Sequence, residues 1–251
     1  MPQLQAEAVM VMTNALRRME SSIPSPERVP IGNSFVFRYA NRGILEALVQ
    51  KLARHISGLN ATAVLLGAGY VQEIGVLFRT LDEIQEDIFF LASAETNGAR
   101  SERHAHYLQA FYADAVLSRK EDSLQISKPN LVPRKKIRSH VMRVLGKGVN
   151  VSQALDAEES VGTAYSGYVH AASENIMEMY GGDPPQFHVQ GMLGTPHIHS
   201  CELNAETYVY RGLMAATVVA KAFGDKQLVG ALYEFLARYE SANAHSREAG
   251  P

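Results

Sequence analysis

The distribution of proline constrains the fold of this chain more than any other feature. The ten prolines lie at positions 2, 24, 26, 30, 129, 133, 184, 185, 196 and 251, so residues 31–128, 134–183 and 197–250 contain none. Proline removes a backbone donor and clashes with the preceding helical turn, whereas proline-free blocks rich in alanine, leucine and glutamate permit long helices. The proline positions therefore predict helical blocks separated by loops.

Apolar residues recur at helical spacing through these blocks and predict an all-α fold, a bundle of about seven helices. No convincing alternating strand is present. A single domain is expected over 1–251, with one weak candidate boundary at 120–133. Asn60 is a candidate N-cap, and Gly224-Asp225 is a junction between two helices. The helices are expected at residues 4–19, 34–57, 60–94, 101–119, 158–180, 204–223 and 225–243, with loops at 21–33 and 183–203 and a basic segment at 134–147.

The expected helix at 60–94 has few polar positions around its axis, which predicts a long helix at the centre of the bundle. It also contains Gly67, Gly69 and Gly75. Each glycine costs about 1 kcal/mol of helix propensity. That cost is understandable if neighbouring parts of the chain approach this helix closely at these positions.

Composition and charge exclude several classes of protein. Cys201 is the single cysteine, so no intramolecular disulfide forms, and the formal net charge of −2 gives no broad electrostatic footprint for nucleic acid. No apolar run approaches the ~20 residues that a membrane span needs, and the N-terminus lacks a secretory pattern. The chain is expected to be cytoplasmic, with no membrane partner. No nucleotide-binding, hydrolase or metalloprotease motif is present, so no cofactor is expected.

Arg79 and Glu83 form the strongest candidate for a functional pair. They are four residues apart in an apolar helix and hence on one face. Buried ion pairs are more often structural than catalytic, and one reading is a pair that fixes the helix register. In the other reading the pair lies beside a cleft and holds an anionic ligand or orients a histidine.

His170 is the candidate histidine, within Tyr165-Ser166-Gly167-Tyr168-Val169-His170. Tyr165 lies about a turn and a half before it on a helix. A lone histidine beside small residues is commonly a satisfied core residue, although its near-neutral pKa suits proton transfer when a carboxylate is adjacent.

These two helices carry a family resemblance. An Arg-x-x-x-Glu helix followed by a Tyr-x-x-Tyr-Val-His helix resembles a bacterial all-helical family of unknown function, over about residues 60–180. That family is similar to the HEPN superfamily, whose members often act as metal-independent ribonucleases in toxin–antitoxin and phage-defence systems. The resemblance implies that Arg79, Glu83 and His170 are the positions carried over, and it implies a homodimer.

The HEPN nuclease signature is an arginine followed at a short spacing by a histidine. Arg100…His106, Arg134…His140 and Arg238…His245 have such spacings, but roughly one or two matches arise by chance in a chain of this composition. Arg134…His140 is the best of them, because the basic segment around it could hold a phosphate backbone. A solvated basic face is the default interpretation of that segment.

A third group of candidate residues, His188, His197, His199 and Cys201, lies in the expected loop. Imidazole and thiolate ligands suit zinc, but the spacing matches no standard zinc motif. No metal site is assigned, and a metal-dependent enzyme remains the third alternative.

Two functional hypotheses follow. In the first, a HEPN-like effector cleaves RNA or processes nucleotides, and Arg79, Glu83, Tyr165 and His170 are its candidate catalytic residues. The ribose 2′-hydroxyl attacks the adjacent phosphate and His170, or alternatively His140, moves the proton. Arg79 stabilises the developing charge and Glu83 orients its partners. In the second, a non-enzymatic helical module binds a partner protein or a small ligand, and Arg79–Glu83 is internal framework.

Overall fold

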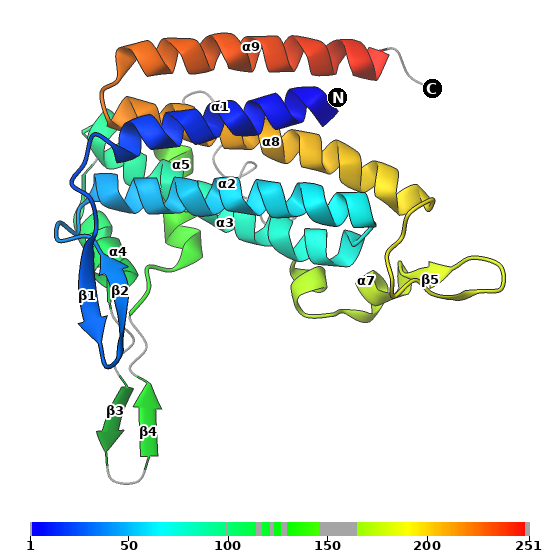
Figure 1. The fold of residues 1–251 in the computed structure, drawn as a ribbon, viewed down its shortest axis with the longest axis horizontal. Coiled ribbons are helices and arrows are strands. Elements are labelled where there is room, and N and C mark those ends of the chain that lie inside the picture. Colours follow the sequence, from blue (N-terminus) through cyan, green and yellow to red (C-terminus); the bar gives the residue numbers. More distant parts are fainter. Residues whose placement is uncertain are drawn as a thin grey trace.

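The computed structural model describes residues 2–98, 100–113, 117–120, 123–126, 130–145 and 165–248. It confirms the all-α class, since long helices build the molecule and the strands are short (Figure 1). The helices are α1 (Pro2–Glu20), α2 (Ile44–Ala68), α3 (Val71–Thr96), α4 (Glu102–Phe111), α5 (Arg134–Leu145), α7 (Ser173–Met177), α8 (Pro196–Ala222) and α9 (Lys226–Glu248). The strands are β1 (Glu27–Ile31), β2 (Ser34–Arg38), β3 (Leu117–Lys120), β4 (Ser123–Ile126), β5 (Tyr180–Gly181) and β6 (Gln186–Phe187).

Helix α3 is the centre of the bundle, as its apolar sequence predicts. It packs against α2, α8, α5 and α4, while α1 lies against α2, α8 and α9 (Figure 1). The buried apolar side chains form one cluster that runs from Ala8 in α1 to Tyr239 in α9. Phe78, Ile88 and Leu91 of α3 are among its most deeply buried members. The expectation of a single domain remains a prediction.

The long helix predicted at 60–94 is wrong in its boundaries, because the chain turns at Gly69-Tyr70. Gly69 ends α2 with φ +77°, a left-handed conformation that glycine adopts without a steric cost. A Cβ there would lie 2.7 Å from the backbone nitrogen of Leu193. Asn60 lies inside α2 and is no N-cap, since its side-chain amide donates to the carbonyl of Ile56 at 3.2 Å.

The expectation of no strands is also wrong, because three antiparallel hairpins are present among the described residues. Strands β1 and β2 join through Gly32-Asn33, with Gly32 at φ +55°. Strand β1 lies in the segment predicted as a loop (21–33), and β2 lies at the start of the helix predicted at 34–57. Their side chains are mostly exposed, so the hairpin gives no pattern of alternating burial in the sequence, and Pro30 within β1 argues against a strand.

The segment between α5 and α8 also differs from expectation. The predicted helix at 158–180 begins outside the described residues, and it is interrupted where it is seen. Residues 165–169 are helical, α7 follows, and Gly181-Gly182 belongs to the β5–β6 hairpin instead of ending a helix. Helix α8 begins at Pro196, within the predicted loop, because proline is well placed in a first turn.

Several predicted ends are confirmed. Ser101 caps α4 in a capping box with His104, although α4 ends at Phe111 and not near 119. Helix α5 covers most of the basic segment. The junction at Gly224-Asp225 is as predicted, with Gly224 at φ +70° and the Asp225 carboxylate accepting from the amide of Leu228 at 3.0 Å.

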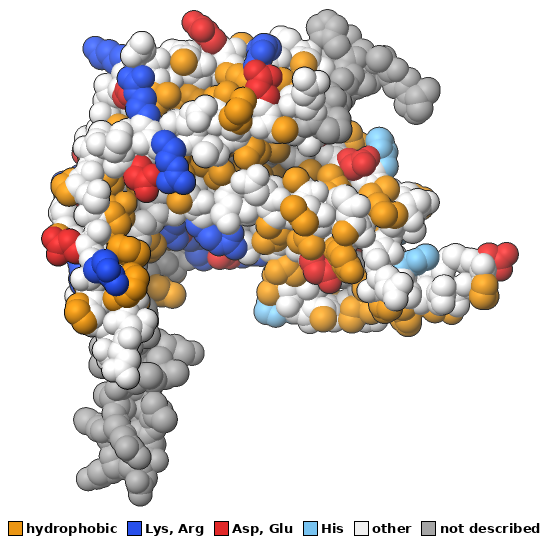
Figure 2. Space-filling model, in the orientation of Figure 1, with side chains coloured by type: hydrophobic (Ala, Val, Ile, Leu, Met, Phe, Trp, Pro, Cys, Tyr) orange, Lys and Arg blue, Asp and Glu red, His pale blue; other side chains and the backbone are white. Residues whose placement is uncertain are grey.

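The molecular surface carries apolar side chains on two projections. The β1–β2 hairpin lies at one end of the bundle, and the segment around α7 and β5 lies at the other (Figures 1 and 2). Phe37 and Ile31 on the hairpin and Val189 and Leu193 near α8 are more than half exposed. Among the described residues, no helix combines the length and the apolar character needed to cross a membrane.

Candidate functional site

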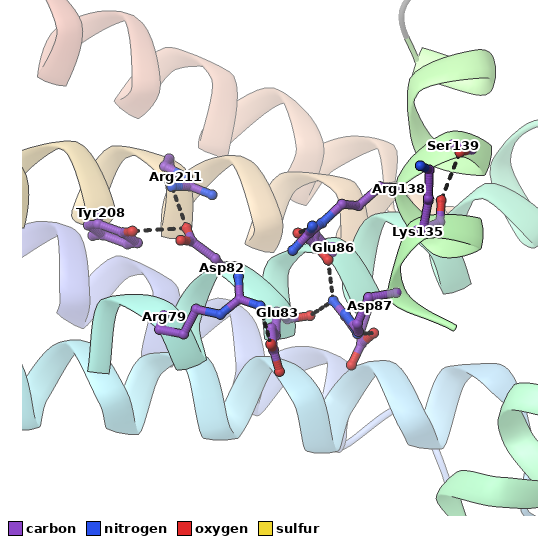
Figure 3. Close-up of polar contacts among 11 residues, drawn as sticks. Arg79, Asp82, Glu83, Glu86, Asp87, Lys135, Arg138, Ser139, Tyr208 and Arg211 are labelled. Carbon is purple, nitrogen blue, oxygen red and sulfur yellow. Dashed lines mark hydrogen bonds and ion pairs between the residues drawn. The ribbon is translucent and has the colours of Figure 1, made fainter. Parts of the chain in front are cut away.

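Arg79 and Glu83 meet as the sequence predicts. The Nη2 atom of Arg79 lies 2.9 Å from Oε1 of Glu83, one turn apart on α3 (Figure 3). The Glu83 side chain is 41% exposed, so water screens the pair and its contribution to stability is small. In the described part of the chain, the other terminal nitrogen of Arg79, Nη1, is buried without a hydrogen-bond partner.

A second ion pair, between Asp82 of α3 and Arg211 of α8, contains a more deeply buried carboxylate. Asp82 Oδ1 lies 2.6 Å from Nη1 of Arg211 and accepts a hydrogen bond from the hydroxyl of Tyr208 at 2.9 Å (Figure 3). Arg211 also donates through Nε to Gln85 at 2.6 Å. Burial raises the pKa of Asp82, and Arg211 and Tyr208 oppose that shift by stabilising the carboxylate.

A second group of ion pairs joins α3 to α5 and α2. Glu86 pairs with Arg134 and, at 2.7 Å, with Arg138 Nε of α5. Asp87 pairs with Arg134 and, at 2.8 Å, with Nζ of Lys51 from α2. Although burial opposes the charged form of Arg134, the two carboxylates raise its pKa.

These contacts give α3 an acidic face that is matched by basic side chains from three other helices. Each carboxylate on this face has at least one cation within 3 Å, and Asp82 and Asp87 are nearly inaccessible. Charges paired in this way hold helices in register and are not free to act on a substrate. The arrangement fits internal framework better than a catalytic centre.

Tyr165 lies next to this framework, on the side of Phe78. Its ring meets Phe78 edge-on at a centroid distance of 5.5 Å, and it approaches Tyr208 at 6.3 Å. Phe78 and Tyr208 stack in parallel at 4.1 Å. The aromatic cluster therefore joins the Asp82–Arg211 pair to the segment that carries Tyr165.

A cavity of about 200 Å³ opens beside this cluster, and we call it the α3–α8 cavity. Residues from α3, from the 165–178 segment and from the first turns of α8 line it. Its apolar and aromatic wall consists of Val71, Gly75, Phe78, Tyr165 and Tyr168. Its polar wall consists of Glu178, His197, Ser200, Cys201 and Asn204.

Hydrogen bonding and burial fix the state of several groups in this wall. Tyr168 donates to Glu178 Oε2 at 2.7 Å, and the Gln72 amide donates to the same oxygen at 3.4 Å. Burial raises the pKa of Tyr165 to about 12 and that of Cys201 to about 11. Both groups are therefore protonated near neutral pH, and the thiol is a poor nucleophile there.

His170 does not join Arg79 and Glu83 in the described contacts. It lies in an exposed turn after residues 165–169, where its backbone amide donates to the carbonyl of Ser166 at 3.1 Å. Among the described residues, no hydrogen bond or ion pair links its side chain to the Arg79–Glu83 pair. Of the four predicted catalytic residues, the structure brings together Arg79 and Glu83, while Tyr165 comes from another segment and packs against Phe78, the residue before Arg79.

The histidines near the start of α8 separate on the helix. His197 and Cys201, one turn apart, line the α3–α8 cavity, whereas His199 is exposed and lies 3.7 Å from Glu202. The Nε2 atom of His188 lies close to Gly182, in the β5–β6 turn. The described residues contain no cluster of three or more potential ligands that could hold a metal ion.

Both residues of the Arg134…His140 motif in α5 are engaged in contacts inside the protein. Nε2 of the buried His140 lies 2.9 Å from the hydroxyl of Ser93 in α3, and the ring packs edge-on against Phe90. Burial lowers the pKa of His140, with His104 adding to the shift. Because Arg134 is held by Glu86 and Asp87, neither member of this motif is presented to a phosphate backbone.

Sequence reasoning missed Asp82, Tyr208 and Arg211. The signal was the excess of carboxylates on an apolar helix, since Asp82, Glu86 and Asp87 need basic partners if α3 is buried. The partner helix could not be named, because Tyr208 and Asp82 lie 126 residues apart in the chain.

No protein-family model, curated protein or solved structure matches this chain.

Proposed function

We propose that this protein is a non-enzymatic helical module that binds a small ligand in the α3–α8 cavity. The observation that carries the proposal is the cavity itself, whose aromatic and polar walls come from three parts of the chain. Ligand sites in proteins are typically concave, with apolar and aromatic walls and a few placed polar groups. The ion pairs of α3 serve as the framework that holds these walls in place.

The chemistry of the wall supports binding over catalysis. A neutral phenol at Tyr165 and a neutral thiol at Cys201 can donate hydrogen bonds, but neither is activated for nucleophilic attack. The carboxylates of α3 are held by arginine and lysine, so they do not supply a general base to the cavity.

Thermal unfolding in the presence of a panel of small cations, anions and neutral compounds tests the proposal. A ligand present at about 100 times its Kd adds roughly 2.7 kcal/mol to the free energy of unfolding, and it raises Tm by several degrees. Ser200→Trp fills the cavity wall and should abolish the shift. His199→Trp, at the preceding position of α8 but outside the cavity, should retain the shift.

The proposal fails if no compound shifts Tm, or if a compound shifts Tm equally in the wild type and in Ser200→Trp. In the first case the cavity is an incidental hollow. In the second case the compound binds elsewhere on the molecule.

RNA cleavage is the second candidate, supported by the unpartnered Nη1 of Arg79 and by the exposure of His170. A guanidinium nitrogen without a partner can donate a hydrogen bond to a phosphate oxygen, and an accessible imidazole can move a proton. An RNA-cleavage time course in EDTA, comparing the wild type with a folded His170→Ala variant, decides it. Cleavage that is lost in the variant would replace the binding proposal, and cleavage that persists would remove His170 from the site.

The resemblance to HEPN proteins further suggests a homodimer, and the sequence suggests a cytoplasmic location. Both remain proposals. The mass of the purified protein by light scattering decides the first, because a homodimer has twice the chain mass of 27.6 kDa.

A further inference from the structure

The charge of the α3–α8 cavity limits the ligands that it can hold. Glu178 contributes a carboxylate, and neither lysine nor arginine is among the described residues that line the cavity. Burial keeps the nearby phenols and the thiol of Cys201 neutral. The Glu178 carboxylate therefore repels an anionic ligand and attracts a cation.

One oxygen of Glu178 remains available to a ligand. Both hydrogen bonds to its side chain, from Tyr168 and Gln72, end on Oε2. Within the described residues, Oε1 has no hydrogen-bond donor. A carboxylate that is held by one oxygen and open at the other is positioned to accept a charge-assisted contact.

Three aromatic rings, of Phe78, Tyr165 and Tyr168, line the cavity beside Glu178. Phe78 and Tyr165 meet at 72°, and Tyr165 and Tyr168 lie 6.2 Å apart and tilted by 35°, so the rings are not stacked on one another. Rings at different orientations around a small cavity can each direct electron density at a cation, the arrangement used for quaternary ammonium groups.

Gly75 makes the position of Tyr168 possible. A Cβ on Gly75 would lie 2.5 Å from Cγ of the Tyr168 ring, so this ring packs directly against the backbone of α3. This contact accounts for the helix-propensity cost of a glycine inside α3, and it fixes one aromatic wall of the cavity.

The volume sets the size of the ligand. An apolar cavity of about 150 Å³ is known to hold benzene. The α3–α8 cavity, at about 200 Å³, therefore has room for a molecule somewhat larger than benzene. The side chains of Ser200 and Asn204 can hydrogen-bond a hydroxyl or an amide on that molecule.

We propose that the α3–α8 cavity binds a small organic ammonium ion, with its charge against Glu178 and its alkyl groups against Phe78, Tyr165 and Tyr168. This inference rests on the proposed function as a ligand-binding module and names the class of its ligand. A compact ammonium ion with a polar arm, of the size of choline, fits the volume and the charge.

Isothermal titration of the full chain with three probes of one shape tests this inference. The first probe is choline, and the second is its uncharged analogue, in which a tert-butyl group replaces the trimethylammonium group. The third is 3,3-dimethylbutanoate, in which a carboxylate replaces the alcohol of that analogue. Choline should bind at least about tenfold more tightly than the uncharged analogue, since the rings and the carboxylate both favour the charge.

Variants of the wall separate its two contributions. Glu178→Gln retains an acceptor for Tyr168 but removes the charge, and it should weaken choline binding about tenfold without affecting the uncharged analogue. Glu174→Gln, on the exposed side of α7, is its control and should bind as the wild type does. Tyr168→Phe should retain most of the affinity and Tyr168→Leu should lose it, provided that both variants have wild-type circular dichroism.

Tighter binding of the uncharged analogue or of the carboxylate overturns the ammonium inference, and it leaves the ligand-binding function standing. Absence of binding by all three probes also overturns the inference. The proposed function itself fails only when the wider panel gives no shift that Ser200→Trp removes, so the two failures are distinguishable.

Discussion

His55 shows how far a single residue can set the conditions under which this fold is stable. It is fully buried in α2, close to Gly212 of α8, and neither ring nitrogen has a hydrogen-bond partner among the described residues. Burial, assisted by the positive charges of Arg211 and Arg54, lowers the pKa of His55 from 6.5 to about 3. The folded protein therefore holds this histidine neutral.

This shift predicts a loss of stability in mild acid. Because the folded pKa lies below the unfolded value, the unfolded state binds more protons between about pH 3 and 6.5. The free energy of unfolding should then decrease as the pH is lowered through this window, and this group contributes up to about 1.4 kcal/mol per pH unit. Urea unfolding at several pH values measures the slope.

His55→Leu should make this dependence shallower, since it removes the proton-binding group from the unfolded state. At neutral pH it should be as stable as the wild type or more so, because two unpartnered buried nitrogens are lost. His199→Ala, at an exposed position, is the control. Equal slopes for the wild type and His55→Leu would contradict the assignment.

Two arginines that pair with carboxylates of α3 should differ sharply in their contribution to stability. Arg211→Ala leaves Asp82 buried without its cation, which typically costs about 3 to 5 kcal/mol. Arg79→Ala removes a one-turn pair with an exposed Glu83, a change worth about 0.5 kcal/mol. Denaturant unfolding measures both, and a loss for Arg79→Ala as large as that for Arg211→Ala would disprove this ranking.

At the scale of elements, the sequence predicts what local rules decide. Helix interiors follow from apolar spacing, and the Gly224-Asp225 junction follows from capping chemistry. The helix break at Gly69-Tyr70 could not be predicted from the sequence, because the apolar pattern continues into α3. The turn packs against the backbone of Leu193, which is distant in the sequence. The β1–β2 hairpin was missed because its exposed side chains show no buried face.

The glycines at the α2–α3 corner give a matched prediction. Gly67 is helical, and a Cβ there meets no atom within 4 Å, so Gly67→Ala should stabilise the protein by about 0.5 to 1 kcal/mol. Gly69 has φ +77° and faces backbone, so Gly69→Ala should destabilise it by roughly 1 to 3 kcal/mol. Tm values of the two variants measure the difference, and a stabilised Gly69→Ala would contradict this account of the turn.

The candidate site shows the same limit on what sequence can predict. Arg79 and Glu83 could be paired from their spacing, because residues four apart share one face of a helix. The contact of Tyr165 with Phe78 has no signal in the sequence. The cavity could not be predicted from the sequence, because Gly75, Glu178 and Cys201 in its walls come from segments that meet only after folding. The sequence offers His197 and Cys201 only as candidate zinc ligands, and the structure places both in the wall of that cavity.

At the scale of the whole molecule, α3 separates two kinds of surface. Toward α5, α2 and the Arg211 side of α8, it presents carboxylates that basic partners neutralise (Figure 3). Toward the first turns of α8 it presents Phe78 and Gly75, which shape the cavity. The first surface holds the bundle together, and we propose that the second receives a ligand.

Amide chemical-shift mapping by NMR tests this claim most directly, with the most stabilising compound of the thermal panel as the ligand. We predict that the signals of Gly75, Tyr168 and Asn204 move with a common saturation curve, while those of Lys135 and Arg138 on α5 stay in place. Shifts confined to α5 and to the neighbourhood of Arg79, with the cavity signals unchanged, would contradict the account and favour a site on the charged face of α3.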